Sequence, residues 1–342
     1  MSPASRRGVG EGPAQLGLFG GAEPVGKQRR LPEVVIREED RALAARLPPL
    51  VRFGPSSWSF PGWRGIVWQG EHSEAELAEE GLYALSRHPL FRTVGVDRGY
   101  YTPVPAEAWR RYREQAAPGF SVVCKAWSEV TTAVFPHHPR YGARAGAANP
   151  AFLDVEITLS QIVRPYLDEM GPHAGPIVFE IPPFSATAAD ARRVADRLAA
   201  LFERLPPEGR YAVELRSRAL LTPRYLQVLA AHRVAHVLNY WAAMPTVGEQ
   251  LSLPGIFTAP FVVSRLMLPP GERYDERRAA MAPFDRIVDP QPTLRTDVLA
   301  LVERTVAEGR ETYVIVNNKA EGSAPLTIAT LAALIVERVA AG

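Results

Sequence analysis

The chain has 342 residues, of which 46% are hydrophobic and 22% charged, and its formal net charge is +2. This length allows one large α/β barrel or two medium domains, and the near-neutral charge gives no overall electrostatic signature for nucleic acid, which leaves that partner open. No apolar run reaches the roughly 20 residues that a bilayer span needs, and the first residues lack the apolar core of a signal peptide, so we expect a cytoplasmic protein without a membrane partner.

Residues 1–49 are rich in Gly, Pro, Arg and Glu and are predicted to form a flexible, disordered tail, with one short periodic stretch, REEDRALAARL, near its end. An isolated apolar island, QLGLF, lies inside it at Gln15–Phe19. It resembles the short peptide by which bacterial replication and repair proteins bind the sliding clamp. Leu16, Leu18 and Phe19 would fill an apolar groove, and Gln15 would hydrogen-bond at its rim. The alternative is that the island packs on the folded domain or has no role.

From residue 50 onward, apolar strand-like runs alternate with amphipathic helical segments. The helix after the first run begins with a capping box, Ser73–Glu76, and the stretch 242–260 has the weakest helical signal because Pro245 and Pro254 interrupt it. The predicted strands are 51–58, 91–101, 120–126, 175–183, 211–216, 235–241, 261–267 and 312–318, and the predicted helices are 73–88, 106–117, 151–170, 187–205, 221–233, 295–309 and 326–341.

Eight strand-then-helix units predict a single α/β domain over residues 50–342, a (β/α)8 TIM-type barrel. The alternative is an open, doubly wound sheet. No Gly-x-Gly-x-x-Gly turn follows the first strand, which favours the barrel.

Polar residues interrupt the apolar runs near the carboxyl ends of the strands, where the active sites of such barrels lie. They are Ser57, Asp97, Lys125, Glu180, Glu214, Arg216, Asn239, Arg265, Asn317 and Asn318. Alternation places Glu214 and Arg216 on one face of their strand. An isolated buried charge is costly, so we expect the three acids and three bases to converge on one pocket, or to form an ion network that only stabilises the barrel.

The strand-end residues include no histidine, which argues against a tight zinc site, so we predict no cofactor and no tightly bound metal. Their carboxylates are compatible with weak binding of a divalent ion such as Mg²⁺. The single cysteine, Cys124, lies in an apolar run and is expected to be a buried small hydrophobe. His137 and His138 are expected to be a solvated loop pair. Trp63 is expected either to cap the pocket or to pack in the core.

Several segments resemble the YecE-like proteins, known as domain of unknown function family 72. They are GPSSWSFPGWRGIVW, FRTVGVDRGYYTPVP, GFSVVCKAW, GPIVFEIPP, YAVELRSR, FVVSRLMLP and VIVNNKAEGSAP, in the family's order over roughly residues 51–330. The resemblance implies a single TIM-type barrel, a suspected relation to sugar isomerases, and no established activity.

The chain departs from the family pattern at five positions. The family's acid in the second strand is Gly95 here, and its amide is Asp97. The histidine that follows Glu-x-Arg in the fifth strand is replaced by Ser217. Glu180 stands where the family commonly has Gln, and Met267 replaces a usual His. The resemblance therefore implies a retained framework with altered polarity, and either a different substrate or a lost activity.

The leading hypothesis is a protein that binds or converts a small polar or phosphorylated, sugar-like ligand. Arg216, Arg265 and Lys125 would bind its anionic part, and Asp97, Asn239, Asn317 and Asn318 would contribute polar contacts. Glu180 or Glu214 would be the general base, which a raised pKa of the buried Glu180 would support. The alternatives are a DNA-maintenance factor recruited to the clamp through Gln15–Phe19, and a barrel that serves as a scaffold without turnover.

Overall fold

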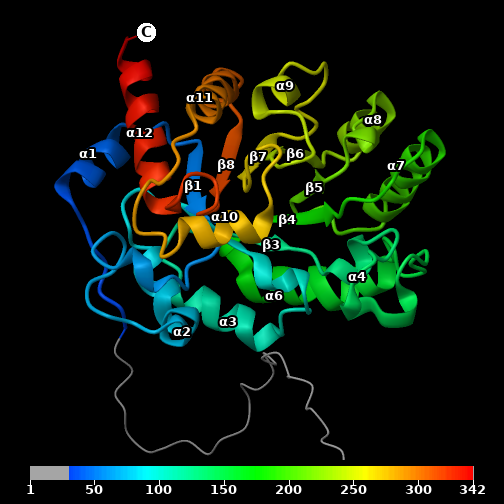
Figure 1. The fold of residues 1–342 in the computed structure, drawn as a ribbon, viewed down its shortest axis with the longest axis horizontal. Helices are drawn as coiled ribbons and strands as arrows, with labels where there is room; N and C mark the ends of the chain where they lie inside the picture. Colours follow the sequence, from blue (N-terminus) through cyan, green and yellow to red (C-terminus); the bar gives the residue numbers. More distant parts are fainter. Residues whose placement is uncertain (1–30, 342) are drawn as a thin grey trace, which may run out of the picture. The chain divides into compact units, whose positions relative to one another are not determined.

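Eight parallel strands form the central sheet of residues 31–341, the part of the chain that the computed structural model describes (Figure 1). They are β1 (Val51–Pro55), β2 (Thr93–Val96), β3 (Ser121–Lys125), β4 (Ala174–Ile181), β5 (Tyr211–Leu215), β6 (Ala235–Tyr240), β7 (Phe261–Leu266) and β8 (Glu311–Val316). Hydrogen-bonded neighbours follow the order β1-β8-β7-β6-β5-β4-β3-β2. The sheet curls until its two outer strands, β1 and β2, approach each other, so the predicted (β/α)8 barrel is confirmed.

The seam between β1 and β2 is narrow because of a glycine. The amide of Arg92 donates to the carbonyl oxygen of Phe53 at 2.9 Å, which links the two strands at this point. A Cβ atom at Gly54 would lie only 1.8 Å from the carbonyl oxygen of Thr93. Any side chain at this position would therefore push the strands apart and open the barrel.

Helices surround the strands (Figure 1). They are α1 (Glu38–Arg46), α2 (Glu74–Leu85), α3 (Ala106–Gln115), α4 (Ser128–Thr131), α5 (Val155–Thr158), α6 (Arg164–Met170), α7 (Ala188–Phe202), α8 (Pro223–Ala231), α9 (Val247–Leu251), α10 (Tyr274–Met281), α11 (Pro292–Ala307) and α12 (Ala324–Ala341). The Ser73–Glu76 capping box is present. None of the helices in residues 31–341 is long and apolar enough to span a membrane.

One expectation about the helices differs from the structure. The helix predicted from 151 to 170 begins at Val155, because the Asp154 carboxylate caps it by accepting from the amide of Ile157 at 2.8 Å. Its middle, Leu159–Val163, is π-helical, just before Pro165, which has no amide hydrogen to continue the ladder. The stretch 242–260, whose helical signal is weak, contains only the five-residue α9.

The folded unit begins earlier than residue 50. It starts at Leu31, and the amide of Val35 donates to the carbonyl oxygen of Val67 at 2.9 Å. The helix α1 follows, and Leu47 is buried in the core. The prediction of a tail through residue 49 thus places the start of the folded unit too late, because the short periodic stretch in this region forms a packed helix. Gln15–Phe19 lies outside the described residues.

The barrel interior changes from apolar to polar along the strands. Successive inward side chains are two residues apart. The apolar layer contains Val123, Val178, Ala212, Val237, Val263 and Ile315, all buried. Two residues further along the same strands, the layer becomes Lys125, Glu180, Glu214, Asn239, Arg265 and Asn317. The strand period therefore carries polar side chains to one end of the barrel, the carboxyl end, which we call the mouth.

Candidate functional site

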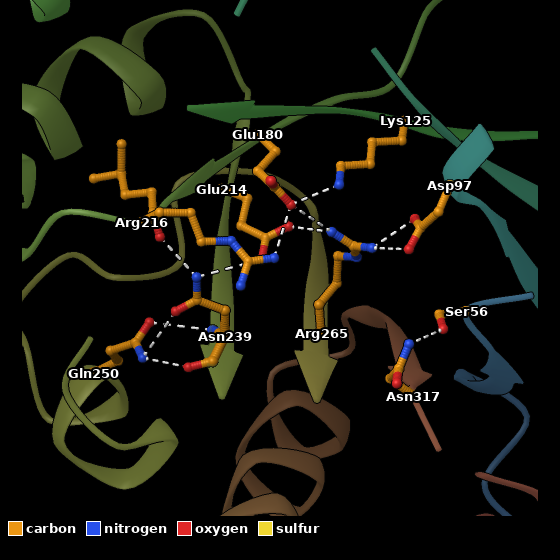
Figure 2. A network of polar contacts seen from close by, with 11 residues as sticks. Ser56, Asp97, Lys125, Glu180, Glu214, Arg216, Asn239, Gln250, Arg265 and Asn317 are labelled. Carbon is orange, nitrogen blue, oxygen red and sulfur yellow. Dashed lines mark hydrogen bonds and ion pairs between the residues drawn. The ribbon is translucent and has the colours of Figure 1, made fainter. Parts of the chain in front are cut away.

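Six charged side chains meet at the mouth, as the sequence predicts (Figure 2). We call them the charge cluster: Asp97, Lys125, Glu180, Glu214, Arg216 and Arg265. They come from the ends of β2, β3, β4, β5 and β7, and the three acids balance the three bases. Side-chain exposure ranges from 0% at Glu214 to 30% at Asp97, so the cluster is deepest at β5 and opens to solvent at β2.

Arg265 lies at the centre of the cluster. Its Nη2 donates to both carboxylate oxygens of Asp97, at 2.6 and 2.8 Å. Its Nη1 donates to Glu214 and approaches Glu180 Oε2 at 3.3 Å. Burial would lower the pKa of Arg265, but these three carboxylates raise it above its ordinary value. The guanidinium therefore stays charged and links β7 to the ends of β2, β4 and β5.

Glu180 is held by three cations. Its Oε2 lies 2.8 Å from Lys125 Nζ and 2.8 Å from Arg216 Nη2, in addition to Arg265. Burial alone would raise the pKa of Glu180, but the charges of Arg216, Lys125 and Arg265 lower it well below its ordinary value of 4.5. The expectation of a raised pKa for Glu180 is therefore wrong. The apolar neighbours along its strand matter less than the cations that contact the carboxylate from other strands. A carboxylate of such low basicity is a poor general base.

Arg216 is incompletely satisfied. Its Nη2 contacts Glu214 Oε1 at 2.6 Å as well as Glu180, and its guanidinium stacks on the Trp241 ring at 3.8 Å. Its Nε and Nη1 are buried and have no hydrogen-bond partner among the described residues. Buried donors of a charged group are seldom left without a partner, so these two positions are where a ligand atom would be most stabilised.

Asn239 is locked in place by a residue that the sequence analysis missed. Its Nδ2 donates to the carbonyl oxygen of Leu215 at 2.7 Å and approaches Glu214 Oε1 at 3.4 Å. Gln250, from α9, accepts from the Asn239 amide at 3.3 Å and donates to its carbonyl oxygen at 2.8 Å. Asn239 therefore orients the buried Glu214. No sequence signal marks Gln250, since it lies in the short helix of the weakest segment.

A second group of polar side chains lies beside the charge cluster, at the ends of β8 and β1. We call Ser56, Asn317 and Lys319 the Lys319 corner. Asn317 Nδ2 donates to Ser56 Oγ at 2.7 Å, and Asn317 Oδ1 accepts from Lys319 Nζ at 2.8 Å. Asn317 is thus at the mouth, as predicted, and the serine that contacts it is Ser56, whereas Ser57 was the serine expected near the end of this strand. Lys319 was missed because it lies three residues beyond the last strand residue.

Asn318 turns away from the mouth. Its Oδ1 accepts from Trp63 Nε1 at 3.2 Å and from the amide of Ala324, the first residue of α12, at 2.8 Å. Trp63 itself is fully buried, so of its two expected roles the structure shows the packed one. Asn317 and Asn318 follow Val316, the last residue of β8, and their side chains bond to different partners, so they do not share a pocket.

The helix α10 covers the Lys319 corner. Its Arg277 is buried and donates to the carbonyl oxygens of Lys319 and Ala320, each at 3.0 Å. The Tyr274 ring lies 4.2 Å from Lys319 Nζ. This helix lies between β7 and α11, in a stretch where no helix was predicted.

The remaining expected positions are not part of the site. His137 and His138 are exposed in the loop after α4, and Cys124 is buried, where burial raises the pKa of its thiol. Within residues 31–341, no group of three or more His, Cys, Asp or Glu side chains is arranged to hold a metal ion. Gly95 faces the Lys319 corner: a Cβ there would lie 3.2 Å from Ser56 Cα, so the interior is tight where the family pattern has an acid.

A cavity of about 940 Å³ lies at the opposite end of the barrel, at the amino ends of the strands. Its lining includes Arg210 and Glu311, which pair with each other. In (β/α)8 barrels the amino ends serve stability and the carboxyl ends carry the chemistry. The incompletely satisfied Arg216 also lies at the carboxyl end. The mouth is therefore the candidate site, although this cavity lies at the other end of the barrel.

Comparisons with known proteins agree with the fold. A family model described as "Protein of unknown function DUF72" matches residues 52–341. Among solved structures, a DUF72 family protein from Enterococcus faecalis V583 is similar, with a TM-score of 0.55, 14% identity, and coverage of 84% of this chain and 95% of that one. A DUF72 family protein from Thermotoga maritima MSB8 has a TM-score of 0.54, 19% identity, and coverage of 84% and 99%. No curated protein matches the chain.

Proposed function

Because the chain belongs to the DUF72 family, whose description assigns no reaction, we propose from the site alone that the barrel mouth binds a small polar ligand carrying an anionic group. The observation that carries this proposal is Arg216, whose Nε and Nη1 are buried without a partner among the described residues. A planar guanidinium suits the oxygens of a phosphate or carboxylate. The Trp241 ring beneath it, at 3.8 Å, fixes the plane in which these donors lie.

The balance of charge supports an anion. Three carboxylates already neutralise the three cations of the charge cluster, and Lys319 adds a further amine beside it. A network that served stability alone would gain from satisfying every donor, because an unpaired buried donor costs roughly 1–3 kcal/mol. The two free donors of Arg216 therefore favour a binding site over a purely structural ion network.

The test compares two arginines at opposite ends of the barrel. Thermal melting would be measured for the wild type, Arg216→Gln and the control Arg210→Gln, with inorganic phosphate, phosphosugars, nucleotides, Mg²⁺ and short DNA. A ligand at 100 times its dissociation constant stabilises the native state by about 2.7 kcal/mol. We expect a phosphorylated small molecule to stabilise the wild type and Arg210→Gln, and to lose its effect in Arg216→Gln. Equal stabilisation of all three proteins would contradict the proposal.

The Mg²⁺ and DNA samples test the remaining alternatives. Stabilisation by Mg²⁺ alone would indicate that the carboxylates, rather than Arg216, form the binding group. Stabilisation by DNA alone would favour a nucleic-acid role for the mouth. If no compound changes the melting temperature, the result would favour a barrel that serves as a scaffold.

A second proposal concerns Gln15–Phe19, which lies outside the described residues. We propose that this QLGLF peptide binds a bacterial sliding clamp, because Leu16, Leu18 and Phe19 would fill an apolar groove and Gln15 would hydrogen-bond at its rim. A synthetic peptide of residues 10–24 would be titrated into a labelled clamp, with a control peptide in which Leu18 and Phe19 are both Ala. Equal affinity of the two peptides, or no binding of the first, would remove the support for this role.

A further inference from the structure

Lysine is rare in this chain and is concentrated at the mouth. Of the 39 basic residues, only Lys27, Lys125 and Lys319 are lysines. Lys27 lies outside the described residues, and the other two reach the mouth from β3 and from the loop after β8. Arginine stays protonated in proteins, whereas a lysine can lose its proton and become a nucleophile. The two lysines at the mouth are therefore candidates for chemistry that needs a neutral amine.

The two mouth lysines have different partners. Lys125 Nζ forms an ion pair with Glu180 at 2.8 Å and lies 4.0 Å from the centre of the Tyr100 ring. Lys319 Nζ contacts a neutral amide oxygen, Asn317 Oδ1, at 2.8 Å, and the Tyr274 ring at 4.2 Å. No carboxylate of the described residues lies within ion-pair distance of Lys319. An amine without a matching carboxylate has less to lose by giving up its proton.

The charged groups around Lys319 act in the same direction, with one exception. Burial is the largest influence and lowers its pKa, and Arg278 of α10, Arg265 of β7 and Arg216 after β5 lower it further. Asp97 after β2 acts against them and raises it. The net effect lowers the pKa of Lys319 from 10.5 to about 8.

We propose that Lys319 is a carbonyl-reactive amine that forms an imine with an aldehyde or ketone group of the anionic ligand at the mouth. This inference rests on the proposed function and names the substrate class: a small molecule that carries both a carbonyl and an anionic group. Arg216 follows β5, Arg265 lies in β7 and Lys319 follows β8, so all three reach the mouth, and one small ligand would present its anion to the arginines and its carbonyl to the amine.

The chemical step is balanced without a cofactor or an oxidant. The Lys319 ammonium first gives a proton to solvent, which reaches the mouth at Asp97, where 30% of the side chain is exposed. The free Nζ lone pair attacks the carbonyl carbon, a C–N bond forms as the C=O π bond breaks, and a proton passes from the nitrogen to the oxygen through solvent. A further proton from solvent lets that oxygen leave as water while the nitrogen lone pair forms the C=N bond, and the protonated imine remains.

The experiment traps this imine on the full-length protein. Wild type, Lys319→Arg and the control Lys27→Arg are incubated with dihydroxyacetone phosphate and reduced with borohydride, which adds hydride to the imine carbon and fixes the label. Peptide mass spectrometry then assigns the label among three lysines and the amino terminus. At pH 8 half of an amine with the pKa of Lys319 is neutral, whereas an ordinary lysine is neutral at about 0.3%, so we expect Lys319 to be labelled at least about tenfold more than Lys27.

Labelling of Lys319 should rise between about pH 7 and pH 9 with a midpoint near 8, should persist in Lys27→Arg, and should vanish in Lys319→Arg without moving to Lys125. Equal labelling of Lys27 and Lys319 would overturn the inference. Glycerol 3-phosphate, which has no carbonyl, separates the two proposals: if it stabilises the wild type and Lys319→Arg while Lys319 stays unlabelled, the anion site stands and the imine fails. Stabilisation of Lys319→Arg also reports that this variant is folded.

Discussion

The charge cluster and the Lys319 corner share one mouth but use different partners. In the charge cluster each cation meets carboxylates: Arg265 contacts three of them, and Lys125 contacts Glu180 at 2.8 Å. In the Lys319 corner the amine meets an amide oxygen, which is itself fixed by a serine hydroxyl. Arg265 and Lys319 are both buried, so the difference between them lies in the charge of their partners and not in exposure.

This difference decides which groups can exchange protons near neutral pH. Matched charges in a buried site stabilise their ionised forms, so the pKa of Glu180 falls and that of Arg265 rises, both away from neutrality. Neutral partners leave Lys319 with the burial penalty and the repulsion of nearby arginines, so its pKa moves toward neutrality. The charge cluster is suited to stabilising the barrel and binding an anion, and the Lys319 corner is suited to a reaction that needs a neutral amine.

The largest expected effect is the removal of Arg265. Arg265→Met would leave Asp97, Glu180 and Glu214 without their shared cation, and breaking a buried ion pair from one side costs about 3–5 kcal/mol. We expect the free energy of unfolding in urea to fall by that amount, or the variant to fail to fold. The matched variant in the other region, Lys319→Met, should remain folded. A loss below about 1 kcal/mol for Arg265→Met would contradict the view that this cluster holds the barrel together.

The second prediction concerns acid. The folded-state pKa of Glu180 is lowered from 4.5, so its ionised form contributes stability above about pH 4.5 that is lost as the pH falls below that value. We expect the wild type to lose on the order of 2 kcal/mol more than Glu180→Gln between about pH 5 and pH 2, by urea unfolding at each pH. Parallel curves for the two proteins would show that Glu180 is not held by the cations around it.

The third prediction concerns stability at alkaline pH and tests the Lys319 corner. The folded-state pKa of Lys319 is lowered from 10.5 to about 8, so between these values the unfolded chain binds more protons, and stability rises with pH. We expect Lys319→Met to be at least as stable as the wild type at neutral pH. The wild type should then gain on the order of 2 kcal/mol relative to this variant as the pH rises to about 10.5. A constant difference would show that Lys319 does not titrate in this window.

The sequence predicted the barrel because its signals are periodic and local. All eight strands lie within the predicted runs or within one residue of them, and the Ser73–Glu76 capping box is present. The start of the folded unit was misplaced because α1 is short and strongly charged, so its composition resembles that of the preceding residues. Leu47, which follows this helix, is buried by tertiary packing, and local composition cannot predict such packing.

The site was only partly predictable, for a geometric reason. The strand period places Lys125, Glu180, Glu214 and Arg265 in one layer, so their convergence follows from the sequence. The resemblance to family 72 is likewise confirmed by the family model. The protonation of Glu180 and the separation of Asn318 from Asn317 depend on which strands are neighbours and how far each side chain reaches. Loop residues such as Lys319 have no period from which to infer their direction.

The smallest expected effect lies in the Lys319 corner, where Ser56 follows β1 and Asn317 follows the neighbouring strand β8. Ser56→Ala removes the acceptor of the partly buried hydrogen bond that Asn317 Nδ2 donates at 2.7 Å, and should lower the free energy of unfolding by about 1 kcal/mol. The Asn317 side chain keeps a second constraint, because its Oδ1 also accepts from the backbone amide of Lys319 at 3.0 Å. In Ser56→Ala we therefore expect the loss of stability at acid pH that depends on Glu180 to stay unchanged. The pH midpoint of Lys319 labelling should move only slightly. A large shift of that midpoint would mean that Ser56, and not the backbone, sets the orientation of the amide that holds the lysine.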